Sequence, residues 1–327
     1  MVDIDRYIAQ HSPAWDRLDV LSRTAAARVK KLRASEIDEL VRLYQQSSGH
    51  LAYVRTHFDD PGLIGRLSLT VGTARGAIYR KRQQPVAAAT RFFSLTLPAV
   101  IWDLRRVIGV AALLFYGSAL AAGLWFGHSD EALKAEYSPE EQRLIAESQF
   151  EDYYSSSAAE EFGTQVTTNN IRVSFTAFAG GILVLPTAVG LLANGFHVGE
   201  LAAVMYRFDA GAKFWGLILP HGLLETFALC IASAAGLRLG WSLLVPGDRT
   251  RTEALAEEGA RSVVAVLGCT LLFVAAGITE SFVTPSGLPT AIRIAIGTLL
   301  LLGAMTWLFG LGRNAAAAGY TGRLGER

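Results

Sequence analysis

The sequence predicts an all-α protein, a polytopic transmembrane helical bundle that follows a helical N-terminal domain. Hydrophobic residues make up 51% of the 327 positions and the mean hydropathy is positive, which is unusual for a soluble globular protein. After residue 106 the apolar residues gather in runs about long enough to cross the ~30 Å hydrocarbon core of a bilayer as helices. The five runs are Val107–Phe126, Val173–Leu192, Phe214–Leu237, Val263–Ile278 and Ile292–Leu311.

Residues 1–104 are expected to form a cytosolic domain of helices that do not cross the membrane. Apolar residues recur at helical spacing over residues 35–56 and again over residues 63–78. The sequence Asp-Asp-Pro-Gly at residues 59–62 is typical of a turn between two such helices. Acidic residues are mixed with basic ones throughout, which favours a small soluble bundle over a lipid-binding amphipathic arm.

The charges on either side of the first apolar run predict its orientation. Residues 1–106 carry 17 Lys/Arg against 10 Asp/Glu, whereas residues 127–172 carry 3 against 10. Cytosolic flanks of membrane spans are enriched in Lys and Arg, so we expect a cytosolic N-terminus and an acidic extracytoplasmic insert over residues 127–168. The bundle as a whole is expected over residues 105–312, followed by a polar C-terminal tail over residues 313–327.

The number of crossings stays open between five and six. With five, the Arg-bearing loop 238–261 and the tail would both lie outside, whereas the positive-inside tendency favours a cytosolic position for both. An even number requires one more reversal of the chain, which we place in Asn194–Gly222 as a broken or re-entrant passage. Asn194-Gly195 is typical of a turn, and the apolar stretch Val198–Phe208 is only about half a bilayer long.

Polar residues within the apolar part of the chain are the candidate functional residues. They are Asn170, Arg172, His197, Glu200, His221, Glu225 and Glu280. His221 and Glu225 are four residues apart, and a helix therefore places them on one face. Because an ionised group in hydrocarbon needs a partner or a cavity, we expect His221 and Glu225 to contact each other near Glu280.

Two interpretations of this predicted cluster remain open. In one, His221, Glu225 and Glu280 relay protons or hold a metal ion; in the other, these groups and the backbone around Pro220 satisfy one another. No HExxH motif is present, so no metal is assigned. The chain also has no P-loop, no GxGxxG and no GxSxG motif, so we expect no cofactor and no soluble-enzyme chemistry.

The overall charge and the pattern of small residues indicate which binding partners to expect. With 30 basic against 29 acidic residues, the chain shows no preference for nucleic acid. Small residues such as those of Gly236-Leu-Arg-Leu-Gly240 let helix backbones approach closely. This pattern fits packing within one chain and homodimer formation equally.

Several of these motifs, taken together and in order, resemble the stage II sporulation protein M family, in a form with a long N-terminal domain. The motifs are Asn169-Asn170-Ile-Arg172, Asn194-Gly195-Phe, Pro220-His221-Gly222-Leu-Leu-Glu225, Gly236-Leu-Arg-Leu-Gly240 and Ile278-Thr-Glu280-Ser-Phe282-Val-Thr-Pro285. The resemblance implies a multi-pass plasma-membrane protein without established catalytic residues. In endospore formers it implies a membrane anchor for two partner proteins that remodel septal peptidoglycan.

The function expected from this resemblance is that of a non-enzymatic membrane scaffold or assembly factor in the cell envelope. Its partners would be the lipid bilayer and other membrane or cell-envelope proteins. Two alternatives stay open. One is a transporter or channel-like protein in which His221, Glu225 and Glu280 line a polar path. The other is an intramembrane metal-dependent hydrolase.

Overall fold

The regular elements of the protein are all helices in the part of the chain that the structure describes. The computed structural model describes residues 4–28, 32–58, 60–79, 85–149 and 159–323. These residues form two compact units, Met1–Pro85 and Val86–Arg327, each of which is treated by itself below. The predicted all-α class is confirmed.

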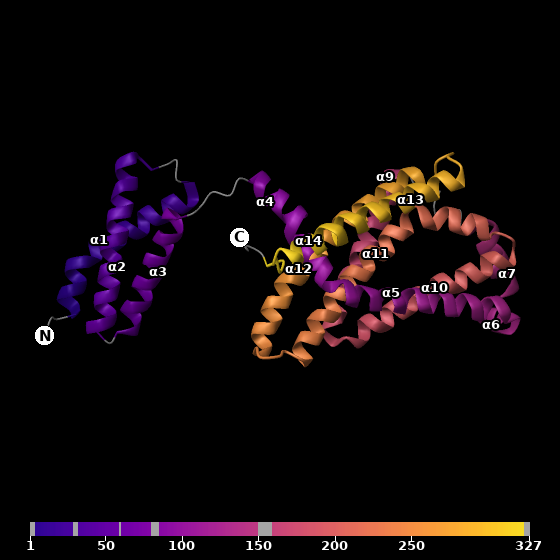
Figure 1. Ribbon diagram of the computed structural model, residues 1–327, viewed down its shortest axis with the longest axis horizontal. Coiled ribbons are helices and arrows are strands. Elements are labelled where there is room, and N and C mark those ends of the chain that lie inside the picture. The colour runs from indigo at the N-terminus through magenta and orange to yellow at the C-terminus, as the bar shows by residue number, and fades with distance from the viewer. Residues whose placement is uncertain (1–3, 29–31, 59, 80–84, 150–158, 324–327) are drawn as a thin grey trace. The chain divides into compact units, whose positions relative to one another are not determined.

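The first unit packs three helices around an apolar core (Figure 1). The helices are α1 (Ile4–Arg28), α2 (Ala34–His57) and α3 (Pro61–Ile78). The side chain of Asp60 starts α3, because its Oδ1 accepts hydrogen bonds from the backbone N–H groups of Gly62 and Leu63 at 2.8 and 3.0 Å. The largest core side chains are those of Trp15, Leu18, Leu21 and Leu67.

The second unit holds the apolar helices, joined by short connections. In chain order they are α4 (Pro85–Arg91), which begins at the boundary between the units, a π-helical turn (Phe92–Thr96), α5 (Leu97–His128), α6 (Asp130–Glu136), α7 (Pro139–Leu144) with a π-helical turn (Ile145–Gln149), α9 (Ala159–Gly180), the 3₁₀ turn η4 (Gly181–Leu183), α10 (Leu185–Arg207), α11 (Gly211–Leu244), α12 (Arg251–Ile278) with the π-helical turn η5 (Thr279–Val283), α13 (Thr290–Met305), a π-helical turn (Thr306–Gly310) and α14 (Leu311–Ala317).

Five of the described helices are long and apolar enough to cross a membrane. They are Val86–His128, Leu185–Arg207, Gly211–Leu244, Arg251–Val283 and Thr290–Ala317. Four of them contain the apolar runs predicted around residues 107–126, 214–237, 263–278 and 292–311. The membrane-bundle architecture is therefore confirmed.

The predicted span Val173–Leu192 is wrong, because the chain breaks inside it. Helix α9 ends at Gly180, and Val184 takes φ 63°, ψ −57°, a backbone conformation that costs a β-branched residue energy. Close packing surrounds the break, since Cβ atoms at Gly181 and Gly240 would overlap the backbone of the facing segment. The apolar run is thus divided between two helices.

The predicted passage Asn194–Gly222 does reverse direction, at residues 208–210, but the turn predicted at Asn194-Gly195 is wrong. Helix α10 continues unbroken through Gly195, which lies against the Phe115 carbonyl of α5 where a Cβ would overlap it. The glycine serves close helix packing rather than a turn. Helix α11 likewise continues through Pro220, and the only reversal in this region is the short connection 208–210, where Asp209 has φ 56°.

Helix directions show how many times the chain passes along the bundle. Helices α5 and α10 run side by side in the same direction, with Gly199 of α10 packed on Ala119 one helical turn after the Gly195 contact (Figure 1). The chain must return between them, and α9 makes that return. The six passages α5, α9, α10, α11, α12 and α13 therefore alternate in direction, although α9 is not among the five apolar helices.

Both ends of the second unit meet at one end of the bundle. Trp307 Nε1 donates to the Phe93 carbonyl at 2.9 Å, and Gly312 packs on the Pro98 carbonyl. We call this end, where α5 begins, α11 ends and α12 begins, the basic end. The opposite end carries α6 and α7 of the acidic insert and is called the insert end. Residues 150–158 of the insert lie outside the described residues.

Candidate functional site

A polar cluster lies among the apolar helices, and it contains four of the seven predicted site residues. We define the central polar cluster as Asn170 of α9, His221 and Glu225 of α11, Glu280 of η5 and Thr284, which follows η5. His221, Glu280 and Thr284 are buried, and Glu225 is partly buried. The cluster brings together residues up to 114 positions apart in the chain.

The imidazole of His221 faces two side chains, that of Glu280 in η5 and that of Thr284, the residue that follows η5. Its Nε2 lies 3.6 Å from Glu280 Oε1, and its Nδ1 lies 3.2 Å from Thr284 Oγ1. The first distance is in the range of an ion pair and beyond that of a hydrogen bond. The π-helical turn at residues 279–283 matters here, because such a turn widens the helix and is frequent at functional sites.

Glu225 has a separate partner on α9. The Asn170 side-chain amide donates a hydrogen bond to Glu225 Oε1 at 2.5 Å. Hydrogen bonding to a buried carboxylate is worth more than a bond between neutral groups. The sequence predicted a contact of Glu225 with His221 from their spacing; the structure gives Glu225 a partner on another helix, and His221 a partner in η5.

One further residue extends the cluster to α13. Arg293, which the sequence reasoning missed, donates from Nη1 to the Thr284 carbonyl and from Nη2 to Thr290 Oγ1 at 3.1 Å. The connection thus reaches four elements of the bundle, α9, α11, η5 and α13. Arg293 lies in an apolar run of the sequence, and an isolated Arg there was a signal that could have found it.

His197 and Glu200 form a second cluster at the insert end. His197 Nδ1 lies 2.8 Å from Glu200 Oε1, and the Tyr137 hydroxyl donates to the same oxygen at 2.5 Å. Burial, reinforced by the hydrogen bond to Glu200, raises the pKa of Tyr137. Since Tyr137 belongs to the insert and Glu200 to α10, the pair fastens the insert to the bundle.

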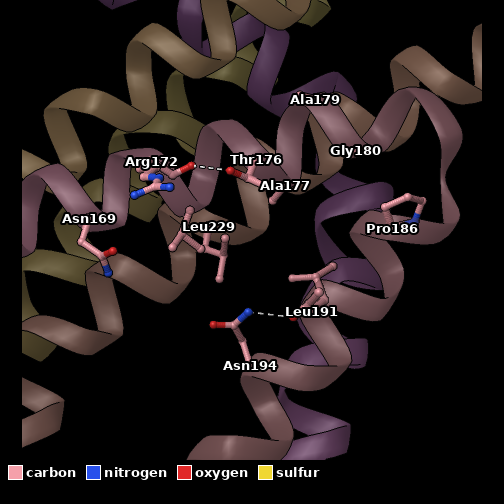
Figure 2. A pocket seen from close by; sticks show the side chains of 12 residues that line it. Asn169, Arg172, Thr176, Ala177, Ala179, Gly180, Pro186, Leu191, Asn194 and Leu229 are labelled. Carbon is pink, nitrogen blue, oxygen red and sulfur yellow. Dashed lines mark hydrogen bonds between the residues drawn. The ribbon is translucent and has the colours of Figure 1, made fainter.

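Arg172 is apart from both clusters, at a groove between α9 and α10. Figure 2 shows Asn169 and Arg172 on the α9 side of this groove and Asn194 on the α10 side. The groove has a volume of about 510 Å³ and is lined mainly by apolar side chains. The Arg172 side chain is exposed, and no described residue forms an ion pair with it.

A network of charged side chains at the basic end was not predicted. Arg261 lies 2.8 Å from Asp103 of α5, and the buried carboxylate of Glu258 lies 3.5 to 3.9 Å from the guanidinium groups of Arg261, Arg238 and Arg249. The network joins α5, α11, α12 and the loop between α11 and α12. Sequence reasoning treated residues 238–261 as an Arg-bearing loop, and it missed Asp103 as a partner because that residue lies more than a hundred positions away.

No group of three or more His, Cys, Asp or Glu side chains is placed to hold a metal ion within the described ranges. His221, Glu225 and Glu280 are divided between an imidazole–carboxylate pair and a carboxylate–amide pair.

Comparisons with known proteins agree with this architecture. The family model described as stage II sporulation protein M matches residues 111–285, and a model for a domain of unknown function (DUF8413) matches residues 5–80. An uncharacterized protein of Methanocaldococcus jannaschii is 32% identical over 123 residues, which cover 37% of this chain and 69% of that protein. No solved structure matches the chain. The first match spans more than half of the chain and all of the central polar cluster, and the protein therefore belongs to the stage II sporulation protein M family.

Proposed function

We propose that the protein is a non-enzymatic scaffold of the plasma membrane that holds cell-envelope proteins, among them proteins that remodel peptidoglycan. The observation that carries this proposal is the pairing of the intramembrane ionisable groups with one another. The Asn170 amide donates a hydrogen bond to the Glu225 carboxylate, and the His221 imidazole faces the Glu280 carboxylate. These contacts connect helices of the bundle. Such pairing is what a stable anchor in lipid requires.

The separation of the two units supports the same function. The first unit has its own apolar core and its own helix cap. We propose that it lies in the cytosol and offers a protein-binding surface there, while the insert offers another on the opposite side. Membership of the family agrees with this role, because the resemblance implies a membrane anchor.

A pair of substitutions tests whether the central polar cluster stabilises the packing of the helices or conducts protons. Asn170→Leu alone leaves the Glu225 carboxylate without its partner, and should lower the amount of folded protein in membranes several-fold. Adding Glu225→Met removes the orphaned carboxylate and should restore that amount, because replacing both partners of a buried hydrogen bond by apolar groups is nearly neutral. In-cell crosslinking to peptidoglycan-remodelling proteins should be restored with it.

The transport alternative gives a different result in the same experiment. A polar path needs the carboxylate itself, so the wild type would carry proton-linked flux in proteoliposomes, and the double variant would be abundant in membranes but lose that flux. That outcome would overturn the scaffold proposal. Loss of the crosslinks in both variants at wild-type abundance would contradict it as well, since a fastening role acts through folding.

A further inference from the structure

A groove between α5 and α10 opens at the insert end of the bundle. It has a volume of about 540 Å³, and side chains of α5, α10 and α11 line it. Along α5 it extends from Tyr116 to His128, about 18 Å of helix, which is close to the ~15 Å that one leaflet contributes to the hydrocarbon core. Because α5 and α10 pack closely, small residues of both helices make up much of the lining: Ala119, Gly123, Gly127, Gly199, Ala202 and Ala203.

The polar side chains with groups to spare lie at one end of this groove. His128 ends α5, Tyr206 is the last residue but one of α10, and Trp215 lies in the first two turns of α11. These are the insert ends of three helices that are long and apolar enough to cross a membrane. At the opposite end of the groove, the Tyr116 hydroxyl is already bonded to Thr226 Oγ1 at 2.8 Å. The groove therefore becomes apolar from the helix ends inwards.

Hydrogen bonding at the mouth leaves one acceptor and one donor available. His128 Nδ1 lies 2.8 Å from the Leu124 carbonyl, which can only accept, so Nδ1 carries the hydrogen and Nε2 of the neutral ring is an acceptor. The Tyr206 hydroxyl accepts a hydrogen bond from Trp215 Nε1 at 2.9 Å, which leaves its own O–H to donate. Both side chains are exposed, and both line the groove.

These properties define the ligand that fits. The apolar part of the groove, along Leu120, Leu124 and Val198, accommodates a hydrocarbon chain. A phosphate is a strong acceptor for the Tyr206 hydroxyl. The acceptor at His128 Nε2 requires a head group that also carries an N–H or O–H, which a primary ammonium provides and a quaternary ammonium does not.

We propose that the α5–α10 groove binds a phospholipid with a hydrogen-bond donor in its head group, such as phosphatidylethanolamine, from the leaflet at the insert end. Its phosphate accepts from the Tyr206 hydroxyl, and its ammonium donates to His128 Nε2. Its acyl chain runs along the apolar walls towards Tyr116, so the head group lies at the helix ends and the chain points into the bilayer. The site is separate from the central polar cluster and does not depend on the scaffold proposal.

Native mass spectrometry of the purified full chain tests the site. Phosphatidylethanolamine and phosphatidylcholine with the same acyl chains are added in graded amounts, and the retained lipid is counted. The two lipids have the same net charge and differ in whether the head group carries an N–H. The wild type should bind phosphatidylethanolamine about tenfold more tightly, as one charge-assisted hydrogen bond predicts.

Two variants distinguish the two hydrogen bonds. Tyr206→Phe removes the donor to the phosphate, which both lipids possess, and should lower both affinities about tenfold while their ratio stays the same. His128→Phe removes the acceptor and should lower the affinity for phosphatidylethanolamine alone, to that of phosphatidylcholine. A merely structural role of either residue would not produce this difference.

A third variant fills the groove without changing a polar group. A Cβ at Gly127 meets no atom within 4 Å, so α5 accommodates Gly127→Leu, whose side chain occupies the space of the acyl chain. It should lower the affinity for both lipids. Gly117→Leu is the matched control, because Gly117 also belongs to α5 and also faces open space but does not line the groove. This control should bind both lipids as the wild type does.

Three results would overturn the proposal. Equal affinities of the wild type for the two lipids would show that the head-group donor is not recognised. A preference for phosphatidylglycerol over phosphatidylethanolamine that persists in His128→Phe would show that the site recognises negative charge. A shift from dimer to monomer in Gly127→Leu, with lipid retention unchanged, would show that a second copy of the chain covers the groove.

Discussion

The Asn170 side-chain amide donates to the Glu225 carboxylate across 2.5 Å, and this one bond connects α9, the least apolar of the six passages along the bundle, to α11. Helix α9 is too polar to insert as an ordinary apolar span, and its place beside α11 depends on such contacts. The stability of the bundle should therefore respond most strongly to substitutions at polar contacts between helices.

The Asn170→Leu variant should lose about 1–3 kcal/mol of unfolding free energy, because Glu225 is left partly buried without its donor. Thermal unfolding in detergent, followed by the static light scattering of the aggregated protein, measures the change. Asn314→Ala, which removes an exposed amide of α14, is the control and should stay within about 0.5 kcal/mol of the wild type. Equal melting temperatures for the two variants would contradict the role of this bond.

Substituting the glycines of α10 by alanine should change the stability of the protein in a direction that depends on which atoms lie next to each glycine. Gly199→Ala places a Cβ onto the Ala119 carbonyl and the backbone of Gly123, and should destabilise by about 1–3 kcal/mol. Gly190→Ala meets open space in the same helix and should stabilise by about 0.5–1 kcal/mol. The two melting curves, recorded side by side, should move in opposite directions; movement in the same direction would show that the α5–α10 packing described here is wrong.

Neutralising Glu258 should lower the stability of the helix packing at the basic end. Its buried carboxylate faces three guanidinium groups, so Glu258→Gln leaves these cations close together without their counter-charge. A loss of about 3–5 kcal/mol is expected from breaking a buried ion pair. Asp248→Asn removes an exposed charge from the neighbouring loop and should have little effect. Hydrogen exchange of the α11–α12 region should increase in the first variant alone.

The first unit should lose stability in mild acid. His50 Nδ1 accepts a hydrogen bond from Trp15 Nε1 at 3.0 Å, and its ring lies 4.1 Å from that of His11. Burial, with a smaller contribution from His11, lowers the pKa of His50 below its ordinary 6.5. The neutral form is therefore favoured in the folded state, so stability is full above pH 6.5 and falls as the pH drops below that value.

Hydrogen exchange of α1 and α2 peptides in the full chain, corrected for intrinsic rates, measures this effect between pH 7 and 5 (about the range in which histidine titrates). His50→Gln keeps an acceptor for Trp15 and removes the titration, so it should abolish most of the pH dependence. Peptides of α11 provide the internal control. An unchanged pH dependence in the variant would assign the effect to another group.

Cysteine labelling of intact cells tests the orientation. The native Cys230 and Cys269 are free but buried, so their background labelling should be low. A membrane-impermeant maleimide should modify a Glu140→Cys variant in the insert and should spare Leu69→Cys in the first unit and Arg313→Cys in α14, until the cells are lysed. This pattern follows from a cytosolic N-terminus and from the common end of the bundle at which α5 begins and α14 lies. Labelling of Arg313→Cys together with Glu140→Cys would contradict it.

The sequence by itself determined the fold class, four of the five membrane helices and the candidate polar residues. These follow from local properties: an apolar run of sufficient length must be buried in lipid, and an ionisable residue within it stands out against its neighbours. The helical spacing of His221 and Glu225 likewise placed both on one face of what is now α11.

Only the tertiary structure decided which polar groups are partners and where the chain breaks. Asn170 and Glu225 are 55 positions apart, and His221 and Glu280 are 59 apart, so no spacing rule connects them. Gly195 reads as a turn residue in the sequence, yet it lies inside α10 because the absence of a Cβ lets α5 approach there. The break falls at Val184 instead, since a local backbone conformation that is unfavourable for valine is held by packing against α11, which no local pattern encodes.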